Sequence, residues 1–93
     1  MKLFLAHCGF YDQALAEGGR NIFESHHNFY VAASDAAEAK ARVKEKTLFK
    51  DKKMHVDGLH EISAVDGYRV VLEPAVPADG GVRSVGYDEA KSL

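Results

Sequence analysis

Apolar and polar residues alternate along several short stretches of this chain, and alternation of period two is typical of β-strands. The first stretch, Lys2–Phe10, opens instead with apolar residues at consecutive positions, Leu3 to Ala6. A strand that is apolar on both faces is typical of a central position in a sheet. The second stretch, Ser25–Ala33, alternates and predicts one face with His27, Phe29 and Val31 and another with His26, Asn28 and Tyr30.

A helix is predicted to follow, beginning at Ser34 and running to about Leu48. Ser34 can cap its first turn, and alanines, the best helix formers, dominate the segment. One apolar stripe is predicted to face the sheet, and it contains Ala36, Ala39 and Val43. A second stripe, with Ala37, Ala41 and Leu48, is left for the C-terminal segment or for self-association.

Two further strands are predicted after the helix. Met54–Val65 changes its apolar phase near Gly58, which indicates a β-bulge there. Asp66-Gly67 is typical of a two-residue type I′ turn, and it leads into a strand over Tyr68–Glu73.

The order of these elements is ββαββ, which predicts a two-layer α+β domain with a four-stranded sheet and one main helix. A β-grasp-like roll places the first strand centrally. A ferredoxin-like fold is the alternative, and it needs a second helix within the connection Tyr11–Phe23, which contains Gly18-Gly19. We expect residues 1–73 to form this single domain and residues 74–93, rich in proline and glycine, to form an extended arm with a short helix at Tyr87–Ser92.

Length and charge narrow the class of protein. The chain has 93 residues and a net charge of −2, which gives no global attraction for nucleic acid. Its single cysteine, Cys8, cannot form an intramolecular disulfide, and we find no stretch long and apolar enough for a signal peptide or a membrane span. We therefore expect a cytoplasmic protein without a membrane partner.

Four segments of the chain stand out together. They are His7-Cys8-Gly9-Phe10-Tyr11-Asp12, Glu24-Ser25-His26-His27-Asn28-Phe29, Met54-His55-Val56-Asp57-Gly58 and Val65-Asp66-Gly67-Tyr68-Arg69. Together they resemble a bacterial family of small domains of unknown function that occur in one or two copies per protein. The resemblance extends over Lys2–Leu72 and transfers no catalytic residue. Because relatives carry two copies, it implies that a single-copy chain pairs with itself.

Histidine is the strongest chemical signal, with five residues in the chain. His26 and Asn28 share one strand face, and His55 and Asp57 share another. If the two faces converged, these four residues could bind a small ligand or a divalent metal. The second and third strands are not neighbours in the predicted fold, so convergence requires the sheet to curl or a second subunit to contribute.

Three other features have structural interpretations that we favour. Cys8 beside His7 resembles a nucleophile pair, but neighbouring strand residues point to opposite faces, and a buried cysteine behaves as a small hydrophobe. The segment Lys40–Lys53 carries seven basic and two acidic residues, which favours a solvated helix end over a nucleic-acid site. Lys44, on a partly apolar helix face, is expected either to extend its charge to solvent or to pair with a carboxylate such as Glu24.

Two hypotheses for function follow. The favoured one is a non-enzymatic binding or self-assembly module, a homodimer that needs no cofactor. The alternative is a small-ligand or metal-binding protein, with or without enzymatic activity, that uses His26, Asn28, His55 and Asp57.

Overall fold

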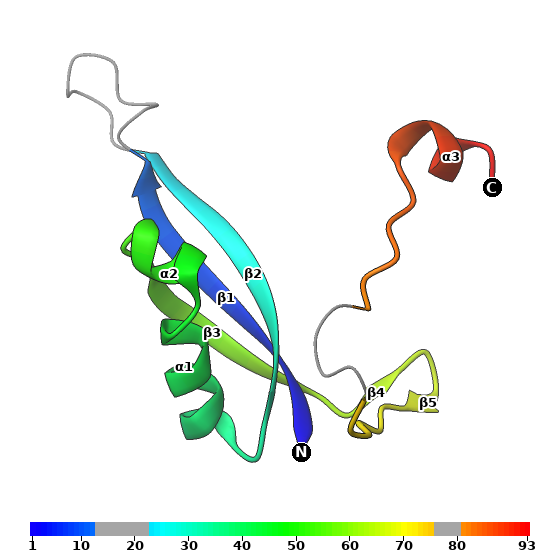
Figure 1. The fold of residues 1–93 in the computed structure, drawn as a ribbon, viewed down its shortest axis with the longest axis horizontal. Helices are drawn as coiled ribbons and strands as arrows, with labels where there is room; N and C mark the ends of the chain where they lie inside the picture. The colour runs from blue at the N-terminus through cyan, green and yellow to red at the C-terminus, as the bar shows by residue number, and fades with distance from the viewer. Residues whose placement is uncertain (13–22, 76–80) are drawn as a thin grey trace.

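The computed structural model describes residues 1–12, 23–75 and 81–93, and its main feature is a three-stranded antiparallel sheet (Figure 1). The strands are β1 (Lys2–Asp12), β2 (Phe23–Ala33) and β3 (His55–Ile62). Their order is β2-β1-β3, so the first strand is central, as its two-sided apolar run predicts. Mixed strands and helices confirm the α+β class.

The first two strands are longer than predicted. Their ladder continues to the pairs Tyr11↔Glu24 and Asp12↔Phe23, which the sequence interpretation assigned to a connection or left outside the strand. Aromatic residues favour strands, and each added antiparallel pair satisfies further backbone groups. The rest of that connection, residues 13–22, lies outside the described residues, and so does the helix that a ferredoxin-like fold would need.

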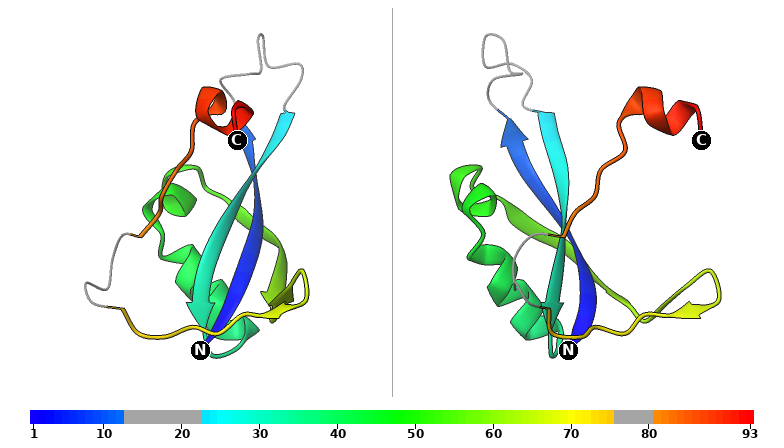
Figure 2. Two further views of the ribbon diagram at one scale, coloured as in Figure 1. Left: turned by 90° about the vertical axis from the view of Figure 1, so that its right-hand side faces the viewer. Right: turned by 45° about the vertical axis from the view of Figure 1, so that its right-hand side comes forward.

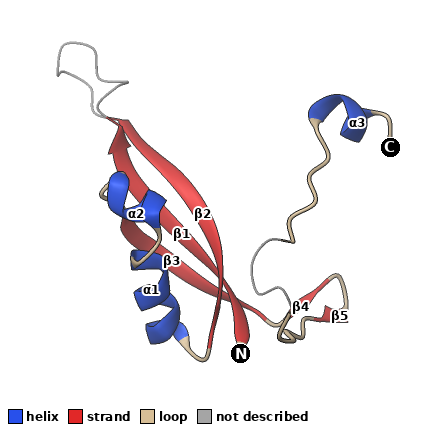
Figure 3. Cartoon of the chain, viewed as in Figure 1, coloured by secondary structure: helices blue, strands red, loops and turns tan. Residues whose placement is uncertain are grey.

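Two helices, α1 (Ala36–Lys44) and α2 (Thr47–Asp51), lie on one face of the sheet (Figures 2 and 3). The N-cap of α1 is Asp35 and not Ser34, because the Asp35 Oδ1 atom accepts the backbone N–H of Glu38 at 2.8 Å. The Ser34 hydroxyl donates instead to Glu38 Oε2 at 2.6 Å. Ser34 therefore supports the first turn through a side chain.

The single helix predicted to reach Leu48 is broken after Lys44. Lys46 is extended, with φ −69° and ψ 137°, and α2 starts after it. Val43 and Phe49 are six positions apart, which in one continuous helix would point them in directions about 120° apart around the axis. Both are buried, and the break is what allows both side chains to face the core.

The core lies between the sheet and these helices, and among the described residues it contains only apolar side chains and one cysteine. The predicted stripe faces it through Ala39 and Val43, while Ala36 is exposed. The buried apolar residues of this core are Phe4, Ala6, Cys8, Val31, Ala33, Ala39, Val43, Phe49 and Met54.

The strand predicted over Tyr68–Glu73 does not join the main sheet as its fourth strand. The chain leaves β3 at Ile62 and forms a separate hairpin from β4 (Ala64–Val65) and β5 (Tyr68–Arg69). The predicted turn is present, since Asp66 and Gly67 have φ values of 52° and 84°. A two-residue turn fixes the pairing of its own flanking residues, but it does not determine which sheet they join.

The C-terminal segment contains a short helix, α3 (Tyr87–Lys91), close to the predicted position. Every residue from 81 to 93 is exposed.

Candidate functional site

Polar side chains from all three strands gather on the sheet face opposite α1, around Gly9. Gly9 pairs with His26 of β2 and with His55 of β3, so these three positions lie side by side across the sheet. Residues that face each other across neighbouring strands point to the same side. The register therefore places His26 and His55 on either side of Gly9.

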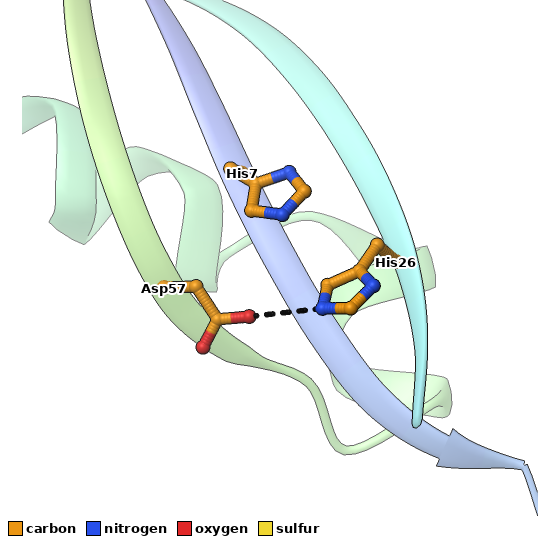
Figure 4. A group of neighbouring side chains, drawn as sticks. All are labelled: His7, His26 and Asp57. Atoms are coloured by element: carbon orange, nitrogen blue, oxygen red, sulfur yellow. Dashed lines mark ion pairs between the residues drawn. The ribbon is translucent and has the colours of Figure 1, made fainter. Parts of the chain in front are cut away.

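Three of the four residues predicted as ligands lie close together here. His55 Nε2 is 3.1 Å from Asp57 Oδ1, and His26 Nε2 is 3.5 Å from Asp57 Oδ2 (Figure 4). Asn28 lies two residues beyond His26, at the next position of β2 on the same face, and contacts His7, not the other three. The structure thus brings together side chains from strands that are not neighbours.

Gly9 explains how side chains from β2 and β3 can meet across β1. A Cβ atom at Gly9 would lie 2.4 Å from Glu24 Oε1, 2.6 Å from His55 Nε2 and 2.7 Å from Asp57 Oδ2. Any other residue would fill the space that these three groups occupy. The convergence that seemed to require a curled sheet or a second subunit depends instead on a missing side chain.

The predicted β-bulge at Gly58 places Asp57 in this cluster. Cys8 pairs with Val56 and His7 pairs with Gly58, so Asp57 is the extra residue between them. A bulge locally reorients side chains, and here it turns Asp57 toward the open face.

His7 and Glu24 also belong to the site, although the sequence interpretation gave them other roles. His7 Nδ1 is 2.7 Å from Asn28 Oδ1, and its ring is stacked on that of His26 with centroids 4.8 Å apart. Glu24 Oε1 is 2.9 Å from His55 Nε2 and 3.5 Å from His26 Nε2, on the face away from the helices, so its partners are histidines and not Lys44. Positions 24, 26 and 28 alternate along one strand, and that spacing was the signal that could have revealed Glu24.

The cluster is accessible to solvent. The side chains of Glu24, His26, His55 and Asp57 are between 32% and 44% exposed. Ion pairs at this level of exposure contribute only about 0–1 kcal/mol each to stability. The ion pairs between these two histidines and two carboxylates therefore do little for the stability of the fold.

The donor atoms form two groups with the chemistry of metal ligands. His7, His26 and Asp57 form one, and Glu24, His55 and Asp57 form the other. Within each group the donor atoms lie within 4.8 Å of one another. Imidazole nitrogens with carboxylate oxygens are the ligand set of zinc and related divalent transition metals.

Cys8 lies on the opposite face of β1 and is completely buried. Burial raises the pKa of its thiol, and the negative charge of Asp57 raises that pKa further. A thiol with a raised pKa is a poor nucleophile at neutral pH. Cys8 therefore acts as a small core residue, as the strand alternation predicts.

The basic segment is partly neutralised by local contacts. Arg42 pairs with Glu38 at 2.9 Å and Lys50 with Glu45 at 3.3 Å. Lys46 and Lys52 lie over the rings of Phe29 and Phe10, 5.7–5.9 Å from the ring centroids. These lysines cover apolar surface at the edge of the core.

The fold and the site together define a small α+β domain with one sheet face covered by helices and one face carrying an exposed histidine and carboxylate cluster. The chain belongs to the family described as Domain of Unknown Function (DUF1543), whose model matches residues 21–72, more than half of its length. Glu24, His26, His55 and Asp57 lie within the matched residues, whereas His7 and Gly9 lie outside them.

No curated protein and no solved structure matches the chain. Among the described residues, no helix has the length and apolar character needed to cross a membrane.

Proposed function

We propose that this domain is a binding module that holds a divalent transition-metal ion on the open face of its sheet, through His7, His26 and Asp57. The carrying observation is the convergence of two imidazoles and one carboxylate within 4.8 Å, from three different strands (Figure 4). Two histidines and a carboxylate are a recurrent ligand set for divalent transition metals, and they leave coordination positions open.

The contact between His7 and Asn28 supports this proposal. When His7 Nδ1–H donates to Asn28 Oδ1, the other ring nitrogen, Nε2, carries the free lone pair. A hydrogen bond of this kind commonly orients a ligating histidine and selects its tautomer. Asn28 is thus a positioning residue, while His7, His26 and Asp57 supply the ligand atoms.

The accessibility of the site supports an exchangeable ion. Structural zinc sites use four protein ligands, whereas sites with three protein ligands keep a position for water or substrate. Here the proposed ligands are His7, His26 and Asp57, and the last two have exposed side chains.

Calorimetric titration with zinc and with nickel tests the proposal. We expect wild type to bind the metal, and His26→Ala to bind it at least about 100-fold more weakly because a ligand atom is lost. This loss is larger than the roughly 10–100-fold that is typical when a residue that only hydrogen-bonds to a ligand is changed. His27→Ala is the matched control, since its side chain belongs to the opposite face of the same strand. Wild type that binds neither metal, or a His27→Ala variant weakened as much as His26→Ala, would contradict the proposal.

We further propose that the chain forms a homodimer, in which a second copy covers the exposed C-terminal residues 81–93. Val82, Tyr87 and Leu93 are between 79% and 91% exposed, and α3 is only five residues long. An isolated helix needs about 12–15 residues to persist in water, so α3 gains from a surface to pack on. Light scattering at tens of micromolar is expected to give twice the chain mass, and a monomer there contradicts this proposal.

The single buried cysteine favours a reducing compartment, and we propose that the protein acts in the cytoplasm. We thus propose that metal binding belongs to the domain of residues 1–73 and that the C-terminal arm serves to form the homodimer.

A further inference from the structure

The two groups of metal-ligand side chains share one member, Asp57. One group adds His7 and His26, and the other adds Glu24 and His55. Every other residue belongs to a single group, so the cluster has five ligand residues: Asp57, and two pairs that each share its carboxylate.

We infer that the open face binds two divalent transition-metal ions, with the Asp57 carboxylate bridging them. This inference rests on the proposed function and extends it: the first ion is held by His7 and His26, and the second by Glu24 and His55. Both ions share Asp57.

The orientation of Asp57 supports bridging. Its Oδ2 atom faces His26 Nε2 at 3.5 Å, and its Oδ1 atom faces His55 Nε2 at 3.1 Å. Each carboxylate oxygen is therefore directed to a histidine of a different group. A carboxylate that uses one oxygen for each ion fits the separation of about 3.5–4 Å that is typical of two-metal sites.

The surroundings of His55 support the second position. Its Nε2 atom lies 2.9 Å from Glu24 Oε1 and 3.1 Å from Asp57 Oδ1. One N–H would have to be shared between two carboxylate oxygens, whereas a cation among these three atoms is coordinated by all of them. Gly9 lies beneath the same three groups and leaves room for them.

The charge balance between the two ions and their ligands indicates which further ligand completes the site. Two divalent ions bring four positive charges, and Glu24 and Asp57 supply two negative ones. Neutral histidines add none. The pair of ions therefore favours a further anionic oxygen ligand between them, such as hydroxide or phosphate, because an uncompensated charge pair repels itself.

Counting bound zinc tests the inference. Wild type, Glu24→Gln and the control His27→Ala are dialysed against excess zinc, and bound zinc per chain is measured by elemental analysis. We expect about two ions for wild type and His27→Ala, and one for Glu24→Gln, which removes a ligand of the second position only. X-ray absorption of the zinc-loaded wild type is expected to give a zinc–zinc distance of about 3.5–4 Å, absent in Glu24→Gln.

The outcomes separate this inference from the proposed function. One zinc per chain in both wild type and Glu24→Gln overturns the second position and leaves the first intact. Two ions without a zinc–zinc distance in that range overturn the bridging role of Asp57. No bound zinc in wild type overturns the proposed function and, with it, the metal pair. Circular dichroism of each variant checks that it is folded.

Discussion

The two faces of the sheet have opposite compositions, although the same three strands form both. On the covered face, β1 contributes Phe4, Ala6 and Cys8, which are 3% exposed or less and pack against α1 and α2. On the open face, the alternate positions of β1 contribute His7, Gly9 and Tyr11.

Side-chain volume matters in different ways on the two faces. The covered face is stabilised by side chains that fill space, since apolar burial is the main favourable contribution to folding. The open face depends on space that is left empty at Gly9, where Glu24, His55 and Asp57 meet. The alternation of side chains along a strand thus places the residues that stabilise the fold on one face and the candidate ligands on the other.

Truncation on the covered face is expected to have the largest effect. Phe4→Ala removes a buried aromatic ring and should lower the free energy of unfolding by about 3–5 kcal/mol, because it loses apolar burial and leaves a cavity. Tyr30→Ala is the control on the open face, where the side chain is 67% exposed, and it should change that free energy by only about 0.5 kcal/mol. Urea denaturation measures both; equal losses would mean that the faces do not differ as described.

Filling the empty position on the open face should affect binding more than stability. Gly9→Ala places a Cβ atom among the ends of three flexible side chains, which can move apart and so disperse the ligands. We expect zinc affinity to fall by about 100-fold, at the upper end of the losses seen when outer partners of a metal site are changed.

Gly86→Ala is the control for this substitution. Gly86 lies outside the sheet, its φ is −73°, and an added Cβ atom there would meet no neighbour within 4 Å. Calorimetric titration of both variants compares them, and equal losses of affinity would show that the empty position at Gly9 is not what assembles the site.

The β4-β5 hairpin belongs to neither face of the main sheet. Gly67 has φ 84°, and a β-branched side chain there costs roughly 1–2 kcal/mol or more in backbone strain. Gly67→Val should lower the melting temperature and leave zinc affinity unchanged. Gly86→Val is the control, since Gly86 has φ −73° and no neighbour within 4 Å of an added Cβ atom. An unchanged melting temperature for Gly67→Val would contradict the turn.

The smallest effect is expected at Glu38, on the helix layer above the covered face. A hydrogen bond from Ser34 and the charge of Arg42 lower the pKa of Glu38 below its ordinary value of 4.5. A lowered pKa in the folded state stabilises the protein above pH 4.5, and this stabilisation is lost as the pH falls through the folded-state pKa. Wild type should be slightly more stable than Glu38→Gln at pH 7, and the difference should shrink as the pH falls below 4.5. A difference that persists at low pH would contradict the assignment.

Local patterns in the sequence were sufficient for most elements of the fold. Alternation over 25–33 predicted which side chains share a face. The register confirms that His26 and Asn28 lie on one face of the sheet and that Phe29 and Val31 lie on the other. The phase change at Gly58 predicted the bulge, and Asp66-Gly67 predicted the turn. Each of these features depends on interactions between residues close in sequence, so a short window contains its cause.

The tertiary structure alone decided where the helix breaks, which sheet the fourth strand joins and which residues complete the site. Phe49 leaves the helical path because the core accepts its side chain beside Val43, and no local pattern contains that contact. His7, Glu24 and Gly9 join the site because three strands that are far apart in the chain align these positions, and no local pattern contains that alignment. The alternation of a strand predicts which residues point together, but only the packed sheet determines which strands lie beside them.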